Sequence, residues 1–87
     1  MVTGGAGSIG SEIVRKIATY DVKQILVVDN AETALHSFEL SLKENFPYLR
    51  CECILVDIRD LKRMRSVFEE YAIDVIYHAA AYKHVPM

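Results

Sequence analysis

The chain alternates between two patterns of hydrophobic residues, and the first is a short, continuous apolar run. Such runs are typical of strands that are buried on both faces of a parallel sheet. They predict strands over residues 1–3, 25–28, 51–57 and 74–81. The first run is so short that it reads as the last piece of a strand whose beginning is missing.

The second pattern is that of the amphipathic helix, and it separates the predicted strands. Apolar residues recur every three or four positions, so that each helix presents one apolar stripe to a core. The three stripes are Ile9, Ile13, Val14, Ile17 and Ala18, then Leu35, Phe38, Leu42 and Phe46, and then Leu61, Met64, Val67, Phe68 and Tyr71. Tyr20 and Pro47 mark the ends of the first two helices, and we expect Asn30 and Asp60 to cap the second and third.

This alternation predicts the fold class. Short connections that run from strand to helix to strand require parallel strands with right-handed crossovers. We therefore expect an α/β protein with a three-layer, Rossmann-type parallel sheet in the strand order 3-2-1-4. The 87 residues suffice for one small core.

Composition narrows the classes of partner. Hydrophobic residues make up 52% of the chain, which argues against disorder. The net charge is -2, so no basic surface favours a nucleic acid. No apolar run approaches the roughly 20 residues of a membrane span, and no signal peptide precedes the domain. We expect a cytoplasmic segment without membrane contact of its own, although a longer parent protein could carry an upstream anchor.

The two cysteines, Cys51 and Cys53, stand two positions apart in a predicted strand, so both thiols should point to one face. Two thiols are too few for a zinc site, and so close a pair makes a poor disulfide. We interpret them as reduced residues that face the core or a partner, with redox activity as the alternative. The sequence predicts no metal site.

All four glycines lie in one stretch, TGGAGSIG at residues 3–10, between the first predicted strand and the first helix. Glycine lets the backbone turn sharply and lets a ligand approach it, and the N–H groups at a helix start form an anion site. Two dinucleotide fingerprints overlap here, Gly5-x-Gly7-x-x-Gly10 and Gly4-x-x-Gly7-x-x-Gly10. An ordinary glycine-rich turn is the alternative, so the neighbouring residues must decide.

An acidic residue stands where the fingerprint expects one, about 20 positions further on, at the end of the second strand. This residue is Asp29, which would bind the adenosine ribose; the alternative is a carboxylate that only caps the strand end. Together with the glycines it predicts dinucleotide binding. Because a carboxylate repels a 2′-phosphate, we expect NAD rather than NADP, and the neutral Asn30 leaves this preference intact.

The third and fourth predicted strands also end in distinctive residues, at positions 56–59 and 77–81. Ligands of open parallel sheets bind at the carboxyl ends of the strands. The successive residues Ala79, Ala80 and Ala81 leave room for a bulky group against the backbone. We expect one ligand to be shared along this edge; loop capping and tight packing are the alternative.

Three stretches, VTGGAGSIG, DIRD and HAAAYKHVP, together resemble the extended short-chain dehydrogenase/reductase superfamily, and more narrowly its CapD-type UDP-N-acetylglucosamine 4,6-dehydratases. The resemblance covers the whole chain. It implies that residues 1–87 are the N-terminal part of an NAD(P)-binding domain, an incomplete half without the catalytic and substrate-binding parts. For the parent protein it implies a lyase of capsular or surface polysaccharide biosynthesis with a UDP-sugar substrate. The bare edge of the fourth strand further predicts a homo-oligomer.

The resemblance also assigns site residues. The cofactor-binding residues would be Gly4, Gly7, Ser8, Ile9 and Gly10 at the pyrophosphate, Asp29 and Asn30 at the adenosine ribose, Asp57 and Ile58 at the adenine, and Ala79, Ala80 and Ala81 toward the nicotinamide. Lys83 and His84 would approach the sugar nucleotide, although Lys83 is equally well explained as a solvent-exposed lysine.

The superfamily's catalytic Tyr-x-x-x-Lys pair is absent, because no tyrosine of the chain is followed four positions later by lysine. We therefore expect no catalytic residue here and no turnover from these residues alone. Two alternatives to the dehydratase stay open. One is a nucleotide-sugar 4-epimerase of the same superfamily, and the other is a non-catalytic dinucleotide sensor.

Overall fold

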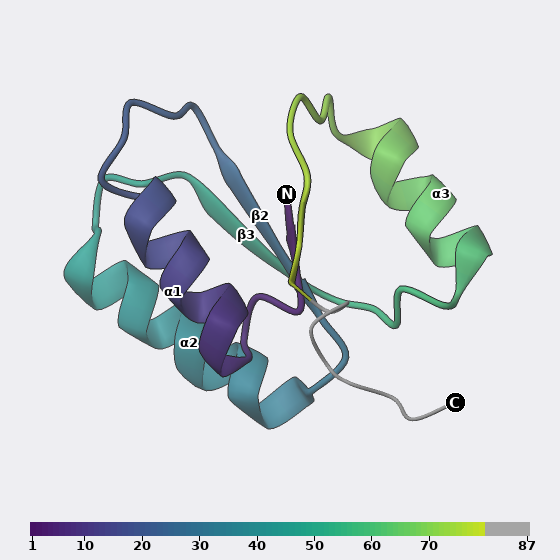
Figure 1. The fold of residues 1–87 in the computed structure, drawn as a ribbon, viewed down its shortest axis with the longest axis horizontal. Helices are drawn as coiled ribbons and strands as arrows, with labels where there is room; N and C mark the ends of the chain where they lie inside the picture. The colour runs from purple at the N-terminus through teal and green to yellow at the C-terminus, as the bar shows by residue number, and fades with distance from the viewer. Residues whose placement is uncertain (80–87) are drawn as a thin grey trace.

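The computed structural model describes residues 1–79, which fold into a parallel sheet with helices on both faces (Figure 1). Within these residues the sheet has four strands in the order β3-β2-β1-β4, and every neighbouring pair is parallel. The predicted fold class and strand order are confirmed. The elements are β1 (Val2–Thr3), α1 (Ser8–Ile17), β2 (Ile25–Asp29), α2 (Glu32–Asn45), β3 (Cys51–Leu55), α3 (Leu61–Glu70) and β4 (Tyr77–His78).

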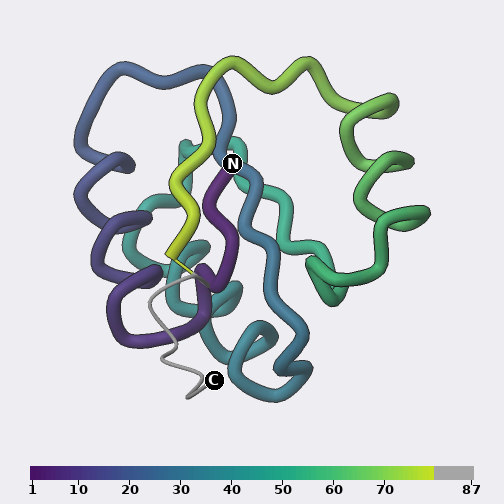
Figure 2. Tube along the Cα trace, turned by 45° about the vertical axis from the view of Figure 1, so that its right-hand side comes forward, coloured from purple at the N-terminus to yellow at the C-terminus, as the bar shows by residue number. Residues whose placement is uncertain are grey.

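The sheet separates two helical layers. Helices α1 and α2 cover one face, and α3 lies on the other (Figures 1 and 2). This arrangement follows from the strand order, because the chain moves outward from β1 to β3 and then crosses back to place β4 beside β1. The carboxyl ends of the parallel strands therefore lie along one edge of the sheet.

The main core lies between the sheet and the layer of α1 and α2. It consists of Val2, Val14, Ile25, Val27, Leu35, Phe38 and Leu42. Burial of each such side chain contributes roughly 1.5–3 kcal/mol. The parallel register places Cys51 beside Ile25 and Cys53 beside Val27, and both cysteines pack against this core as free thiols. The prediction that both thiols share a face is confirmed.

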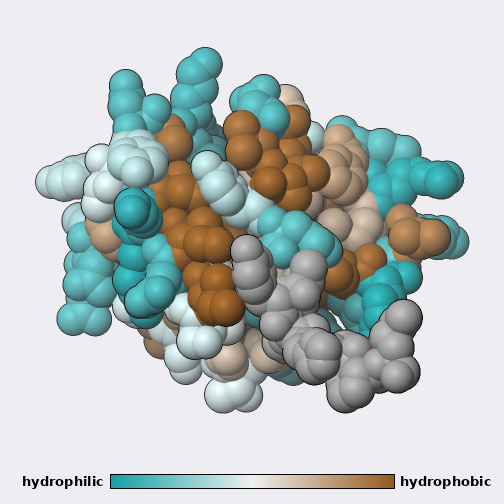
Figure 3. All heavy atoms as spheres, viewed as in Figure 1, coloured by the Kyte–Doolittle hydropathy of each residue, from teal (hydrophilic) through white to brown (hydrophobic). Residues whose placement is uncertain are grey.

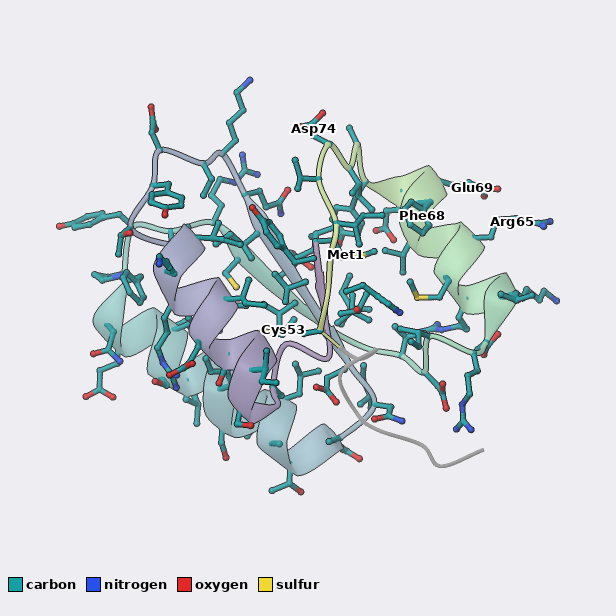
Figure 4. All side chains as sticks on the ribbon, in the orientation of Figure 1. Met1, Cys53, Arg65, Phe68, Glu69 and Asp74 are labelled. Carbon is teal, nitrogen blue, oxygen red and sulfur yellow. The ribbon has the colours of Figure 1, made fainter. Side chains whose placement is uncertain are left out.

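The layer formed by α3 is covered less completely than the sequence predicts. Val67 is buried, but Leu61 is 76% exposed and Phe68 is 45% exposed. Arg65 and Glu69 point away from the sheet, as the polar face of the helix should (Figure 4). The predicted burial of Leu61 and Phe68 is therefore wrong: within residues 1–79 only the middle of the apolar stripe meets a surface that covers it.

Other apolar side chains reach the surface as well. Val75 and Ile76 are exposed in the segment that leads from α3 to β4, where hydrophobic surface is visible (Figure 3). Ile9, predicted to belong to the buried stripe of α1, is 46% exposed. Ile9 lies in the first turn of α1, next to the glycine loop, and does not belong to the core cluster.

Of the two predicted helix N-caps, one is confirmed. Asp60 caps α3, since its Oδ1 accepts a 3.1 Å hydrogen bond from the Arg63 amide. The predicted capping of α2 by Asn30 is wrong. The N-cap of α2 is Ala31, and its amide donates to Oδ1 of Asp29 at 3.0 Å. The aspartate thus takes the place that the asparagine would have filled, because its side chain folds over the following turn.

Two strands are shorter than predicted by more than one residue, whereas β1 lacks only Met1 of the predicted residues 1–3. β3 ends at Leu55 rather than at residue 57, because the chain turns where the Arg59 amide donates to Oδ1 of Asp57. Of the predicted residues 74–81, β4 comprises Tyr77 and His78 within the part that the structure describes, and residues 80 and 81 lie outside it. No helix in the described part of the chain is both long and apolar enough to cross a membrane.

Candidate functional site

The glycine loop joins β1 to α1 at the carboxyl edge of the sheet, and its backbone is packed too closely for side chains. Gly4 has a φ of 65°, in the left-handed region that favours glycine. A Cβ on Gly10 would collide with the Gly4 carbonyl and come within 2.8 Å of the Gly5 Cα. A Cβ on Gly5 would lie 2.5 Å from Cγ1 of Val27. The loop is therefore held between the first turn of α1 and β2.

Gly7 differs from these glycines. A Cβ there would meet only the Gly4 carbonyl oxygen, at 3.3 Å. Gly7 is the N-cap of α1, and no side chain among the described residues caps this helix. The exposed Ser8 and Ile9 follow it, and the first turn holds no acidic residue. Because the first N–H groups of a helix lack partners within the helix and its dipole favours anions, this end of α1 can bind phosphate.

Asp29 lies next to the loop, at the carboxyl end of β2. It is only 5% exposed. Its Oδ2 accepts a 3.0 Å hydrogen bond from the Ala6 amide in the glycine loop, and its Oδ1 accepts the bond from Ala31. The Gly5 amide also donates to the Val28 carbonyl at 3.2 Å. The loop is thus tied to the end of β2 by one backbone bond and one carboxylate.

A hollow of about 400 Å³ opens beside the ends of β2 and β3. It is lined by Asn30, Glu32, Leu55, Val56, Asp57, Asp60 and Arg63. Two of the predicted site residues, Asn30 and Asp57, therefore share one surface. Arg63 was missed by the sequence reasoning, although its position in the first turn after a strand-end loop was a usable signal, because such turns lie at the carboxyl edge of the sheet.

Asp57 is engaged in a local ion pair. Arg59 donates to it through its amide, Nε and Nη2, and the shortest of these bonds is 2.7 Å. These hydrogen bonds from Arg59 hold the pKa of Asp57 well below its ordinary value. Its side chain is 34% exposed, and that of Arg59 is 85% exposed, so a ligand could displace the arginine at little cost.

The end of β4 contributes a contact that the sequence did not predict. Thr3 is 2% exposed on β1, and its Oγ1 lies 2.7 Å from Nδ1 of His78 on β4. This hydrogen bond joins the two strands at the carboxyl edge. Ile58 is partly buried, and Ala79 is buried directly after β4. The predicted site residues Ala80, Ala81, Lys83 and His84 lie outside the described residues.

A larger cavity, of about 700 Å³, lies at the opposite edge. Met1, residues 20–26 and residues 71–75 contribute to its lining. These segments lead into the amino ends of the strands, where open parallel sheets do not bind their ligands. We therefore place the candidate site at the smaller hollow and the glycine loop. Within residues 1–79 no three His, Cys, Asp or Glu side chains converge as metal ligands.

Comparison with known proteins identifies the family. The model of the polysaccharide biosynthesis protein family matches residues 1–87, the full chain. The chain belongs to this family. The resemblance noted in the sequence is thereby confirmed.

Relatives in the family match the chain from end to end. An uncharacterized membrane protein of Methanocaldococcus jannaschii is 47% identical over 87 residues. The probable polysaccharide biosynthesis protein EpsC of Bacillus subtilis is 38% identical over 88 residues. A UDP-N-acetylglucosamine 4,6-dehydratase (inverting) of Campylobacter jejuni is 32% identical over 88 residues. Each match includes 100% of this chain. The chain spans only 24%, 15% and 25%, respectively, of the lengths of these three relatives.

The further relatives fall into the same classes. They include the capsular polysaccharide biosynthesis protein CapD of Staphylococcus aureus, a dTDP-glucose 4,6-dehydratase and a UDP-glucose 4-epimerase. The chain is therefore similar to enzymes that dehydrate or epimerise nucleotide sugars.

Proposed function

We propose that this chain is the cofactor-binding part of a nucleotide-sugar 4,6-dehydratase of polysaccharide biosynthesis, and that the parent protein acts on a UDP-N-acetylglucosamine type of substrate. In this proposal residues 1–87 form the N-terminal part of an NAD(P)-binding domain. The observation that carries it is the glycine loop: its backbone is packed against β2, it opens onto an uncapped helix end, and a strand-end carboxylate lies beside it.

The described residues fit a dinucleotide. The pyrophosphate would be held by Gly4, Gly7 and the amides of Ser8, Ile9 and Gly10, at the start of α1, where no side chain among the described residues caps the helix. The adenosine ribose would be bound by Asp29 and Asn30, and the adenine would lie in the hollow that Asp57 lines, with the neighbouring Ile58 beside the ring. The nicotinamide supplies hydride acceptance and return when bound, while these residues bind and orient the cofactor.

Cofactor preference follows from the charge at the end of β2. Asp29 is buried beside the position of the ribose, and Asn30 offers no positive charge. A 2′-phosphate would bring two negative groups together at a site with little solvent to screen them. We therefore propose NAD as the cofactor.

The 4-epimerase is the second candidate, because a UDP-glucose 4-epimerase of Drosophila melanogaster is 39% identical over 92 residues. Both reactions need the same cofactor site, so the described residues do not separate them. We favour the dehydratase because the HAAAYKHVP stretch resembles the dehydratases and because the polysaccharide biosynthesis family matches the full chain. A homo-oligomer stays a prediction, supported by the exposed Val75 and Ile76 beside the edge strand β4.

One experiment tests the proposal. The parent protein that carries this chain is purified, titrated with NAD and NADP by calorimetry, and incubated with UDP-N-acetylglucosamine. We expect NAD to bind more tightly and a 4-keto-6-deoxy sugar nucleotide to form. A product that differs only in configuration at C4 would identify the epimerase. Binding of NAD without conversion of any UDP-sugar would identify the sensor, and tighter binding of NADP would contradict the assigned role of Asp29.

A further inference from the structure

Asp29 is a buried carboxylate without a counter-ion among the described residues, where the ion pair found is that of Arg59 with Asp57. Burying a charge is costly unless hydrogen bonds compensate. Both of its oxygens have such bonds, each 3.0 Å long, and both donors are backbone amides. One donor belongs to the glycine loop, 23 residues away, and the other to the start of α2.

These two bonds connect three elements at one point. Ala6 lies in the loop between β1 and α1, Asp29 ends β2, and Ala31 begins α2. The loop has few other ties to the strand, since the Gly5 amide bonded to the Val28 carbonyl is its other link to β2. A loop with four glycines within residues 3–10 has high conformational freedom when it is not restrained. The carboxylate supplies part of that restraint.

We propose that Asp29 is a positioning residue for the phosphate-binding loop, in addition to any contact with a ribose. Its carboxylate fixes the loop and the start of α2 before a ligand is present. The ribose contact rests on the proposed function, whereas the positioning role does not. An ionised carboxylate has about four acceptor sites, so two backbone bonds leave room for ribose hydroxyls. Asp29 would then restrain the phosphate-binding loop and also bind the ribose hydroxyls.

The proposal has a consequence for cofactor specificity. Replacing the strand-end carboxylate by a small neutral residue is the direct way to admit a 2′-phosphate. Here the same change frees the Ala6 and Ala31 amides, and it disorders the loop that must bind the pyrophosphate. We expect the replacement to weaken the binding of both cofactors rather than to exchange one for the other.

The test is hydrogen exchange of individual amides, measured by NMR on the parent protein without any ligand. In Asp29→Ala, the Ala6 and Ala31 amides should exchange at least about tenfold faster than in the unmodified protein, as expected when a hydrogen bond to a charged group is lost. Rates are referred to the Val27 amide in the buried centre of β2, which reports on global unfolding. Unchanged protection of Ala6 and Ala31 relative to Val27 would overturn the proposal.

Two further variants provide a milder replacement of Asp29 and a control. Asp29→Asn has nearly the same shape but one acceptor oxygen, so at least one of the two amides should lose protection even if Asp29→Ala does not fold. Asp57→Asn is the matched control, because the Asp57 carboxylate accepts hydrogen bonds from Arg59 and none from the Ala6 or Ala31 amide, so it should leave the exchange of these two amides unchanged. Failure of NAD to bind the unmodified protein would contradict the proposed function but leave this exchange result standing.

Discussion

Asp29 and Asp57 follow neighbouring strands, and the sequence assigns both to the same cofactor, yet the structure places them in opposite environments. Asp29 is 5% exposed and accepts a hydrogen bond from the Ala6 amide, 23 residues away, besides the local one from Ala31. The side chain of Asp57 is 34% exposed and is bonded by Arg59, two residues further on. Asp29 connects the glycine loop to the end of β2, whereas Asp57 is bonded within its own loop.

The difference arises from the positions of the strands. β2 lies between β3 and β1, so the end of β2 is flanked by the glycine loop on one side and by the chain that follows β3 on the other. β3 is an edge strand, and its end has a neighbour on one side. The interior strand β2 therefore brings one long-range backbone donor, the Ala6 amide, to its terminal carboxylate, whereas the carboxylate after the edge strand β3 is bonded within its own loop.

The largest expected effect comes from breaking the loop that Asp29 holds. In Gly10→Ala the new Cβ would strike the Gly4 carbonyl, which is backbone and cannot move aside cheaply. We expect the free energy of unfolding to fall by about 3 kcal/mol, the upper end of the usual range for overpacking. We also expect NAD binding to be lost. Urea unfolding and calorimetry measure the two.

Gly7→Ala is the matched control for that variant. Its Cβ would meet one atom at 3.3 Å, so a smaller loss of stability is expected. Equal stability of the Gly10→Ala and Gly7→Ala variants would show that the loop is not packed as described.

The comparison itself is tested by removing each carboxylate in turn. Asp29→Ala leaves the Ala6 and Ala31 amides without their carboxylate acceptor, and we expect it to lower the free energy of unfolding by about 1.5–3 kcal/mol. Asp57→Ala removes an exposed local pair and should cost much less. Urea unfolding measures the free energy of unfolding of both variants. Similar losses of stability in the two would contradict the different roles of Asp29 and Asp57.

The pH dependence of Asp57 gives a smaller effect. Hydrogen bonds from Arg59 lower its pKa below the ordinary value of 3.8, so the stabilisation is present above about pH 3.8 and is lost as the pH falls further toward the lowered pKa. In Arg59→Ala the Asp57 carboxyl should titrate at a higher pH, as followed by its NMR carbon shift. Arg65→Ala, which alters the outward face of α3, is the control (Figure 4). An unshifted titration in Arg59→Ala would contradict the ion pair.

The smallest effect concerns the cysteines of the edge strand. A hydrogen bond between the two thiols lowers the pKa of Cys51, whereas the same bond and burial raise that of Cys53. Since the thiolate is the nucleophile, Cys51 should be alkylated by iodoacetamide before Cys53, as mass spectrometry would show. In Cys53→Ala the alkylation of Cys51 should slow; an unchanged rate would mean that the two thiols do not interact.

The sequence by itself determined the order of the elements, the parallel sheet and the position of the glycines between β1 and α1. It also predicted the cap at Asp60, whose partner Arg63 stands three residues away. These features depend on the periodicity of apolar residues and on turns that close within a few positions, so they can be read from a single stretch of chain.

Only the tertiary structure decided which partners the strand ends acquire. Ala6 binds Asp29 across 23 positions, and Thr3 meets His78 across 75. It also left Leu61 and Phe68 exposed although their spacing predicts burial. No local pattern encodes these outcomes, because they depend on which strands become neighbours and on which surfaces cover a helix. The physical reason is that hydrogen bonds and burial are properties of pairs of segments, and the pairs exist only after the sheet has assembled.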